Sequence, residues 1–320
     1  MTGGTGCVGR ATVARLLAAG HAVRGVWRGR SPESLGFAAA GALEWVRAEL
    51  AVDDVAPLVK GCDAVVHLAA LVHRAEVHDP AAYRRENLAT TERLHGAAIA
   101  AGIQPGRFAF ASTVAVYGRD FDLHADESTP TQPRSPYGES KLAAERVVLE
   151  RGGVALRLPI THGPGDRGNF ATLVRAIERG RFALPGPCEE PRSLLSAANA
   201  AHGFALAIEQ AAAAQLFLLT DDDDRSVRFL ARQIAAALAE SGRPTTPLRE
   251  LPYALVWPAA ALGSALGRVG LRSPVTLAAL RKLTTPLTFS CKKAVRTLGY
   301  VPVETFEVAV RKTVASLVSA

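Results

Sequence analysis

Apolar and polar residues alternate along the first half of the chain in a pattern that predicts strands followed by helices. Short runs rich in β-branched and aromatic residues are separated by longer segments in which apolar residues recur every three or four positions. This order predicts an α/β fold built on a doubly wound parallel sheet. The expected strands are 21–27, 43–46, 64–68, 108–112 and 154–158, and the expected helices are 8–19, 82–101 and 138–151.

The pattern changes near residue 163, where a polar loop is followed by mostly helical sequence interrupted by prolines. We expect a first unit, 1–162, that holds the sheet, and a smaller helical lobe, 163–320, whose segment 193–220 packs back on the first unit. The acidic run 221–224 is expected to be a solvated loop that caps the next helix together with Ser226. Further helices are expected at 170–179, 197–213 and 227–240, and a strand at 216–220.

The sequence TGGTGCVG at residues 2–9 predicts a tight turn that leads into a helix. Gly3 permits the turn, Gly6 lets the backbone approach a phosphate, and Gly9 allows close packing of the helix on the sheet. The first N–H groups of such a helix attract anions, and the turn is typical of a dinucleotide site. The residues expected to contact the dinucleotide here are Gly3, Thr5, Gly6, Cys7, Val8 and Gly9.

One expected element is missing before this turn. A glycine turn of this kind follows a buried parallel strand, but only Met1 precedes Thr2. We therefore expect that the natural chain begins several residues upstream and that the printed sequence lacks the first strand. The alternative, a flexible glycine-rich tail, is disfavoured because a helix and a strand follow in the right order.

Composition and charge narrow the classes of function. The net charge of +7 comes mainly from arginines that are scattered, without basic runs, which gives no support to nucleic-acid binding and suits anionic cofactors or substrates. The four cysteines form no CxxC pair, which favours reduced thiols and argues against a disulfide frame or a metal site. We see no signal peptide and expect a cytoplasmic protein. The longest apolar stretch, 251–267, contains two prolines and is too short to span a bilayer.

Tyr137 and Lys141 lie four positions apart at the start of a predicted helix, so their side chains share one helical face. A phenol has a pKa of about 10, and a nearby ammonium group lowers it. The pair can therefore exchange a proton with an alcohol or a ketone. Ser112 and Thr113 end a predicted strand upstream, where open parallel sheets bind ligands, and a hydroxyl there can hold the reacting oxygen beside Tyr137.

Several further motifs occur in a characteristic order along the chain. They are TGGTGCVG, HLAA at 67–70, Asn87 followed by Thr90 and Thr91, STVAVYG at 112–118, YGESK at 137–141, LRLPITHGPGD at 156–166, RSLLSAAN at 192–199, FLLTDDD at 217–223 and SCKKAVRTLGYVP at 290–302. Together they resemble the extended short-chain dehydrogenase/reductase family, that is, the NAD-dependent epimerase/dehydratase family. The resemblance implies a Rossmann domain that binds NAD(P) over residues 1–162 and a substrate lobe over 163–320.

The resemblance also implies roles for individual residues. Tyr137 would be the acid and base, Lys141 would lower its pKa and bind the nicotinamide ribose, and Thr113 would orient the substrate oxygen. Asn87 would be structural near the site, and His67 is expected to be a core histidine without a catalytic part. Further cofactor contacts are expected from Leu68, Ala69, Ala70, Asn87, Ser112, Tyr137 and Pro159.

The choice between NADP and NAD depends on the end of the second expected strand. Enzymes of this fold that use NAD usually carry an acid there, to bind the ribose 2′-hydroxyl. This chain has Arg28, followed by Arg30, and an arginine can meet a 2′-phosphate. We therefore favour NADP over NAD, with Arg28, Glu49 and Leu50 around the adenosine end.

Two residues indicate a substrate that carries a diphosphate. Asn169 and Arg192 match positions at which relatives hold a sugar nucleotide, and Ser112 is expected to contact the same substrate. Each residue also has an alternative role without substrate binding. Asn169 could be a helix N-cap, and Arg192 could be a surface or interface arginine. Thr113 is followed by Val114 and Ala115, which cannot transfer a proton, so a dehydratase is disfavoured. The favoured function is an epimerase, or related oxidoreductase, of a nucleotide-diphosphate or lipid-diphosphate sugar, acting through a keto intermediate.

Two other functions stay open. The apolar segments 252–267 and 274–290 resemble the substrate lobe of 3β-hydroxysteroid-type dehydrogenases, and such a helix could touch a membrane surface. A dinucleotide-binding sensor without catalysis is disfavoured because Thr113, Tyr137 and Lys141 are all present. His162 is expected to be a packing residue, the alternative being a second proton carrier. By analogy with relatives, a homodimer through the helix 138–151 is expected.

Overall fold

The computed structural model describes residues 1–29, 31–33, 41–72, 79–118, 124–210, 212–243, 247–268, 273 and 275–319. Its strands in chain order are β1 (Val23–Trp27), β2 (Leu43–Arg47), β3 (Val65–His67), β4 (Phe108–Thr113), β5 (Val154–Leu158), β6 (Ile160–His162), β7 (Ala183–Pro185), β8 (Pro191–Arg192), β9 (Leu194–Ser196), β10 (Leu216–Leu218), β11 (Arg225–Ser226) and β12 (Arg249–Leu251). Its helices are α1 (Cys7–Ala18), α2 (Ala56–Val59), α3 (Pro80–Tyr83), η2 (Arg84–Ala89), α4 (Thr90–Ala100), η3 (Pro105–Arg107), η4 (Val114–Tyr117), α5 (Pro136–Glu150), α6 (Asn169–Glu178), α7 (Ala197–Gln210), α8 (Val227–Glu240), α9 (Tyr253–Arg268), α10 (Leu277–Thr284), α11 (Lys292–Leu298) and α12 (Phe306–Val318).

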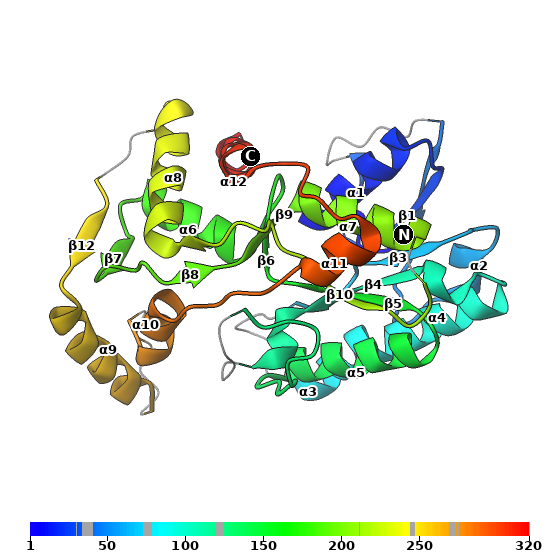
Figure 1. The fold of residues 1–320 in the computed structure, drawn as a ribbon, viewed down its shortest axis with the longest axis horizontal. Coiled ribbons are helices and arrows are strands. Elements are labelled where there is room, and N and C mark those ends of the chain that lie inside the picture. Colours follow the sequence, from blue (N-terminus) through cyan, green and yellow to red (C-terminus); the bar gives the residue numbers. More distant parts are fainter. Residues whose placement is uncertain are drawn as a thin grey trace.

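A parallel sheet forms the centre of the larger unit (Figure 1). Strand β3 pairs with β4, β4 with β5, and β5 with β10, while β1 pairs with β2. Thr2 bridges Val26 of β1 and His67 of β3, so the strand order is β2, β1, Thr2, β3, β4, β5, β10. This order, with parallel neighbours throughout, confirms the predicted doubly wound α/β sheet.

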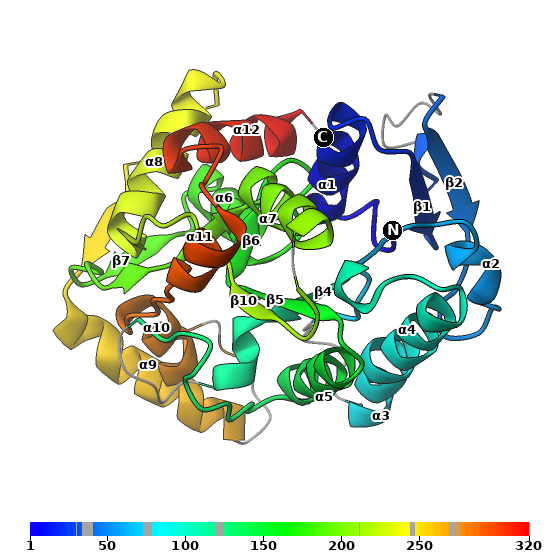
Figure 2. The ribbon, with the colours of Figure 1, turned by 45° about the vertical axis from the view of Figure 1, so that its right-hand side comes forward.

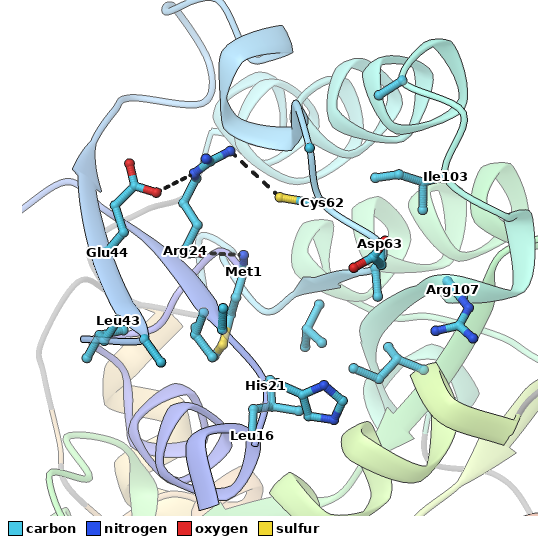
Figure 3. Close-up of a pocket in the computed structure, with 18 of the residues that line it drawn as sticks. Met1, Leu16, His21, Arg24, Leu43, Glu44, Cys62, Asp63, Ile103 and Arg107 are labelled. Atoms are coloured by element: carbon cyan, nitrogen blue, oxygen red, sulfur yellow. Dashed lines mark hydrogen bonds and ion pairs between the residues drawn. The ribbon is translucent and has the colours of Figure 1, made fainter. Parts of the chain in front are cut away.

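Met1 and Thr2 occupy the sheet position between β1 and β3. Val26 N donates to Met1 O at 2.8 Å, and Thr2 N donates to Val66 O at 3.0 Å. Toward the amino ends of these strands, a cavity of about 940 Å³ is lined by Val23 of β1 and Val66 of β3, and Figure 3 shows Arg24 and Cys62 in contact at its wall. The cavity lies at the edge of the sheet opposite to the strands' carboxyl ends, so it is distinct from the candidate site described below.

Helices cover both faces of the sheet (Figure 2). Helices α4 and α5 bury Leu94 and Val148 against Phe108 of β4 on one face. Helices α1 and α7 pack on each other and on the other face, where Val13 and Phe204 are completely buried. Apolar stripes that recur every three or four residues therefore meet the apolar strands from two sides, which is why the strands contain few polar residues.

The segment 193–220 returns to the sheet, because β10 adds an edge strand to β5 and α7 packs on α1. The remaining lobe has its own core beneath α6, α8 and α12, which contains Phe170, Ile234 and Val310. Helices α9 and α10 pack on each other at the end of the molecule farthest from β2 and α2 (Figure 1).

The helix expected at 82–101 is present, although its middle is the π-helical segment η2, which carries Asn87. One local prediction was wrong in part. The acidic run is not simply solvated: Asp221 is buried, and its Oδ1 accepts hydrogen bonds from Ser196 N at 2.8 Å and from Asn199 Nδ2 at 2.7 Å. Ser226 does cap α8, as expected, by accepting a hydrogen bond from Phe229 N.

Candidate active site

The glycine turn lies at the carboxyl edge of the sheet and leads directly into α1. Gly3 has a φ of 70°, and Gly6 N donates to Gly3 O at 3.0 Å. A Cβ on Gly9 would lie 2.0 Å from Gly3 O, and one on Gly3 would lie 2.7 Å from Ala69 N, so both positions require glycine. No side chain among the described residues caps α1, which leaves its first N–H groups free to bind an anion.

These features fit a dinucleotide pyrophosphate. The close approach of Gly3 to Ala69 also brings Leu68, Ala69 and Ala70 beside the turn, in the positions expected of them. Thr5, Cys7 and Val8 are half-buried around the start of α1. Burial raises the pKa of the Cys7 thiol to about 12, so this side chain stays protonated at neutral pH.

His67 is buried inside the fold, where two threonine hydroxyls hold its ring. Its Nδ1 lies 2.6 Å from Thr2 Oγ1, and its Nε2 lies 3.0 Å from Thr91 Oγ1. Thr2 Oγ1 also accepts from Ala69 N at 3.2 Å. Burial, more than the nearby Lys141, lowers the pKa of His67 to about 3, so the ring is neutral. The histidine therefore positions the turn and the end of β3, which agrees with the expected structural role.

Asn87 connects the loop after β3 to the start of α5. Its Oδ1 accepts from Leu71 N at 2.7 Å, and its Nδ2 donates to Leu71 O and to Ser140 Oγ. Ser140 Oγ in turn donates to Tyr137 O at 2.8 Å. The widened helical turn of η2 places this buried amide between the two segments, so Asn87 fixes the backbone that carries Tyr137.

Thr113 and Tyr137 come together at the end of β4. Ser135 caps α5 by accepting from Gly138 N at 3.1 Å, which places Tyr137 in the first turn of the helix. A hydrogen bond joins the Thr113 and Tyr137 hydroxyls. Burial raises the pKa of Tyr137, and this hydrogen bond acts in the opposite direction. The two hydroxyls thus define one point at which a substrate oxygen can be held.

Lys141 lies one helical turn after Tyr137 and is 2% exposed. Its Nζ is 3.9 Å from the centre of the Phe110 ring on β4. Burial lowers its pKa to about 7, and the charge of Glu145 opposes this shift. An ammonium group whose pKa lies near neutral can gain or lose its proton at working pH, which is useful beside a phenol that must do the same.

Ser112 faces the opposite side of β4 from Thr113. Its hydroxyl donates to Glu145 Oε2 at 2.5 Å, and Arg157 of β5 donates to both oxygens of that carboxylate. Arg157 Nη1 also donates to the Tyr117 hydroxyl at 2.7 Å. The Ser112 side chain is therefore committed to this buried network, and only its backbone lies near the expected cofactor and substrate positions.

This network was missed in the sequence analysis. Its signal was available, because Glu145 follows Lys141 at the same spacing by which Lys141 follows Tyr137, and so shares their helical face. Pro159 is buried directly after β5, whose Leu158 pairs with Thr113 of β4.

Arg28 follows β1, where the adenosine part of the cofactor was expected, and it forms ion pairs with two carboxylates. Its Nη1 lies 3.3 Å from Glu49 Oε1 and 2.9 Å from Glu86 Oε2. Leu50 is half-buried beside them. Arg30 lies outside the described residues. The arginine expected to recognise a 2′-phosphate thus already has two carboxylate partners, one of them contributed by η2.

The residues expected to bind a diphosphate do not join this site through their side-chain contacts. Arg192 is buried and donates through Nη2 to the backbone carbonyls of Lys282 and Thr285, at the C-terminal end of α10. Asn169 is exposed at the first position of α6, and Asp166 caps that helix by accepting from Gly168 N and Ala171 N. Neither the surface arginine nor the N-cap suggested as an alternative matches the structure.

His162 is completely buried in the core of the smaller lobe. Its ring stacks on Phe170 at 4.6 Å and meets the edge of Phe306. Its Nδ1 lies 3.4 Å from Thr313 Oγ1, and its Nε2 lies 3.7 Å from Asp221 Oδ2. These contacts agree with the packing role and give the ring no access to the Tyr137 hydroxyl.

Comparisons with known proteins agree with this geometry. Residues 1–217 match the model of the NAD dependent epimerase/dehydratase family. The chain is 29% identical over 278 residues to a UDP-glucose 4-epimerase of Vibrio cholerae, covering 82% of this chain and 79% of the relative. It is 30% identical over 342 residues to a 3 beta-hydroxysteroid dehydrogenase/Delta 5-->4-isomerase of Mycobacterium tuberculosis, covering 100% and 90%.

The fold is similar to that of solved structures. A UDP-glucuronic acid 4-epimerase from Bacillus cereus, crystallised in complex with NAD, superposes with a TM-score of 0.76 at 19% identity, covering 99% of this chain and 97% of that one. The similarity extends over both the sheet and the helical lobe.

Proposed function

Since the chain belongs to the NAD dependent epimerase/dehydratase family, and so is an NAD(P)-dependent enzyme, we propose that it oxidises a secondary alcohol of an apolar substrate or reduces the matching ketone. The coarser activity follows from the family and from the presence of Thr113, Tyr137 and Lys141 together. The substrate class is our own inference, and it rests on what Arg192 contacts.

The chain's own residues supply proton transfer and orientation. The substrate oxygen is held between the Thr113 and Tyr137 hydroxyls. Tyr137 Oη takes the hydroxyl proton during oxidation and returns it during reduction, while Lys141 lowers the free energy of the phenolate. When bound on the glycine turn, beside Ala69 and Pro159, the nicotinamide supplies the hydride acceptor or donor.

The contacts of Arg192 carry the choice of an apolar substrate. A diphosphate substrate needs buried cations with free donors, and Arg192 was the expected one. Its Nη2 instead donates to the last carbonyls of α10, and burial lowers its pKa. The buried Nε of Arg192 has no hydrogen-bond partner among the described residues. Recognition of a diphosphate through Nη2 would leave those carbonyls without their donor, a cost that an apolar substrate avoids.

A sugar epimerase is the second candidate, favoured by the similarity to the Vibrio cholerae UDP-glucose 4-epimerase over 82% of the chain. The same three residues would then act twice, on a sugar hydroxyl and on the keto intermediate. Arg192→Leu separates the two candidates. We expect lower thermal stability, because α10 loses its C-terminal donor. A stable variant with a raised KM for a UDP-sugar would favour the epimerase.

We further propose NAD as the cofactor, against the preference for NADP drawn from the sequence. Glu49 and Glu86 surround Arg28 with two carboxylates, which disfavour an added 2′-phosphate and can accept hydrogen bonds from ribose hydroxyls. The check is the ratio of kcat/KM for NAD and NADP. A ratio that favours NAD is expected, and a clear preference for NADP that Arg28→Ala abolishes would overturn this choice.

The substrate class is tested with two panels, apolar secondary alcohols such as 3β-hydroxysteroids and UDP-hexoses. Nicotinamide absorbance and sugar stereochemistry are followed together, the latter by proton NMR. Net reduction of the cofactor by apolar alcohols, without interconversion of sugar epimers, is the expected result. Interconversion of epimers without net change in the cofactor would overturn it and establish the second candidate.

A further inference from the structure

The net charge of the chain resides entirely in one segment. Residues 251–303 contain seven lysines and arginines and not one aspartate or glutamate. The rest of the chain carries 30 cationic and 30 acidic side chains and is therefore neutral. Four of the seven cations belong to the part of this segment that spans α9 and α10, namely Arg268, Arg272, Arg281 and Lys282. A partner of this region must be anionic or neutral.

The same region presents large apolar side chains to solvent. On α9, Leu255 is 69% exposed, Leu262 is 62% exposed and Trp257 is 50% exposed. Leu255 and Leu262 lie seven positions apart on α9 and so share one face of the helix. The exposed Tyr253 and Trp257 lie on the other side of α9, and the exposed Leu251 ends the preceding strand β12. Soluble proteins seldom leave such a group of neighbouring apolar residues uncovered without a binding role.

The exposed face is fixed by tight packing on the opposite side of the helix. A Cβ on Gly263 would lie 1.9 Å from Val275 O, and Ser264 Oγ accepts from Leu277 N at 2.8 Å. These contacts attach α9 to the start of α10. Arg281 and Lys282 on α10 are exposed, so cationic side chains accompany the apolar face of the neighbouring helix. Figure 1 shows the two helices together at one extremity of the molecule.

We propose that α9 and α10 form a docking surface for an anionic lipid bilayer. The Leu255 and Leu262 side chains enter the boundary between headgroups and acyl chains, and the cations pair with lipid phosphates. A second copy of this chain is a poorer occupant, because a two-fold contact through this surface would set cations against cations with no acid to pair them. Among the described residues no helix is long and apolar enough to cross a membrane.

The test is sedimentation of the purified protein with vesicles of phosphatidylcholine, alone or with about a third of phosphatidylglycerol. We expect binding to the anionic vesicles that weakens with added salt. Leu255→Ser combined with Leu262→Ser should weaken binding at least tenfold. Arg281→Gln combined with Lys282→Gln should weaken it on anionic vesicles. The matched control combines Val52→Ser and Val301→Ser, which remove exposed apolar side chains elsewhere and should change nothing.

Several outcomes would overturn the proposal. One is the absence of binding to either vesicle. A second is equal weakening by the control pair, which would mean that no specific surface exists. A third is self-association that the Leu255 and Leu262 substitutions abolish, which would identify this face as a contact between copies. None of these readouts requires turnover, so they are independent of the proposed reaction.

Discussion

Glu145 Oε1 and Arg157 Nη2 lie 2.6 Å apart between α5 and β5, and both side chains are almost completely buried. The same carboxylate accepts from Ser112 at the end of β4. It also lies one helical turn after Lys141, and its charge favours the protonated form of that lysine. One buried carboxylate therefore joins the helix that carries Tyr137 to two strands of the sheet and supports the ammonium group beside it.

Removing Arg157 should destabilise the fold strongly. Arg157→Met leaves the Glu145 carboxylate buried without its cationic partner, and breaking such a pair costs about 3–5 kcal/mol. Arg146→Met is the matched control, because Arg146 is exposed on the same helix. Urea unfolding of both variants measures the free energy of unfolding. Equal values for the two variants would contradict a stabilising role for the buried pair.

Lys141→Met should stabilise the protein at neutral pH while it impairs catalysis. Burial lowers the pKa of Lys141 to about 7, whereas the unfolded chain keeps that proton up to a pKa of about 10.5. Because the unfolded state binds more protons between these values, stability rises with pH across this window, and the cost of burial is complete at pH 7 and below. Methionine removes the cost.

Urea unfolding at pH 7 and at pH 10 checks this sign. The gain in the free energy of unfolding should be on the order of a few kcal/mol at pH 7 and should shrink toward pH 10. Lys60→Met, at an exposed position, controls for general effects of the substitution. A gain of the same size at both pH values, or a loss at pH 7, would show that Lys141 does not titrate as described.

Gly9→Ala should prevent cofactor binding. The added Cβ would lie 2.0 Å from Gly3 O, so the turn must move and its N–H groups lose their alignment. Gly96→Ala on α4 is the control, because a Cβ there meets nothing nearer than Arg151 Nη1 at 3.9 Å. Calorimetric titration with NAD should detect binding by the control and none by Gly9→Ala. Binding of equal strength by both would refute the placement of the pyrophosphate.

His95→Phe should make the protein less sensitive to acid. The His95 ring is buried and stacks on Phe108 at 4.0 Å, and burial lowers its pKa to about 4. The unfolded chain takes up that proton near pH 6.5, so stability is lost as the pH falls from about 6.5 toward 4. Thermal unfolding across this range should give a flatter curve for His95→Phe. Curves of identical shape for His95→Phe and the parent protein would reject the assignment.

Local signals were sufficient to predict the sheet and the meeting of Thr113 with the first turn of the helix that carries Tyr137 and Lys141. Strands β3, β4 and β5 are short apolar runs, and Tyr137 and Lys141 lie at a spacing that only a helix brings to one face. The turn at Gly3, Gly6 and Gly9 could be predicted because steric limits on a Cβ act within a few residues. These predictions depend on contacts that are close in the sequence.

The errors depend on distant contacts. The residues around Arg192 do not indicate its hydrogen-bond partners. These are carbonyls at the end of α10, which lies some 90 residues later in the chain. Asp221 was taken for a solvated acid because its partner Asn199 lies 22 positions earlier. The π-helical turn at Asn87 likewise places one side-chain amide in hydrogen bonds with two residues distant in sequence, Leu71 and Ser140.

The central claim is that Tyr137 transfers the proton, and Tyr137→Phe tests it most directly. The ring and its packing against Tyr83 remain, and only the hydroxyl that meets Thr113 is removed. Tyr253→Phe, on the exposed α9, is the control. With the best apolar alcohol found, we predict a fall in kcat of about 10²- to 10⁴-fold at unchanged NAD affinity. A Tyr137→Phe enzyme that turns over within a fewfold of the parent would contradict the account.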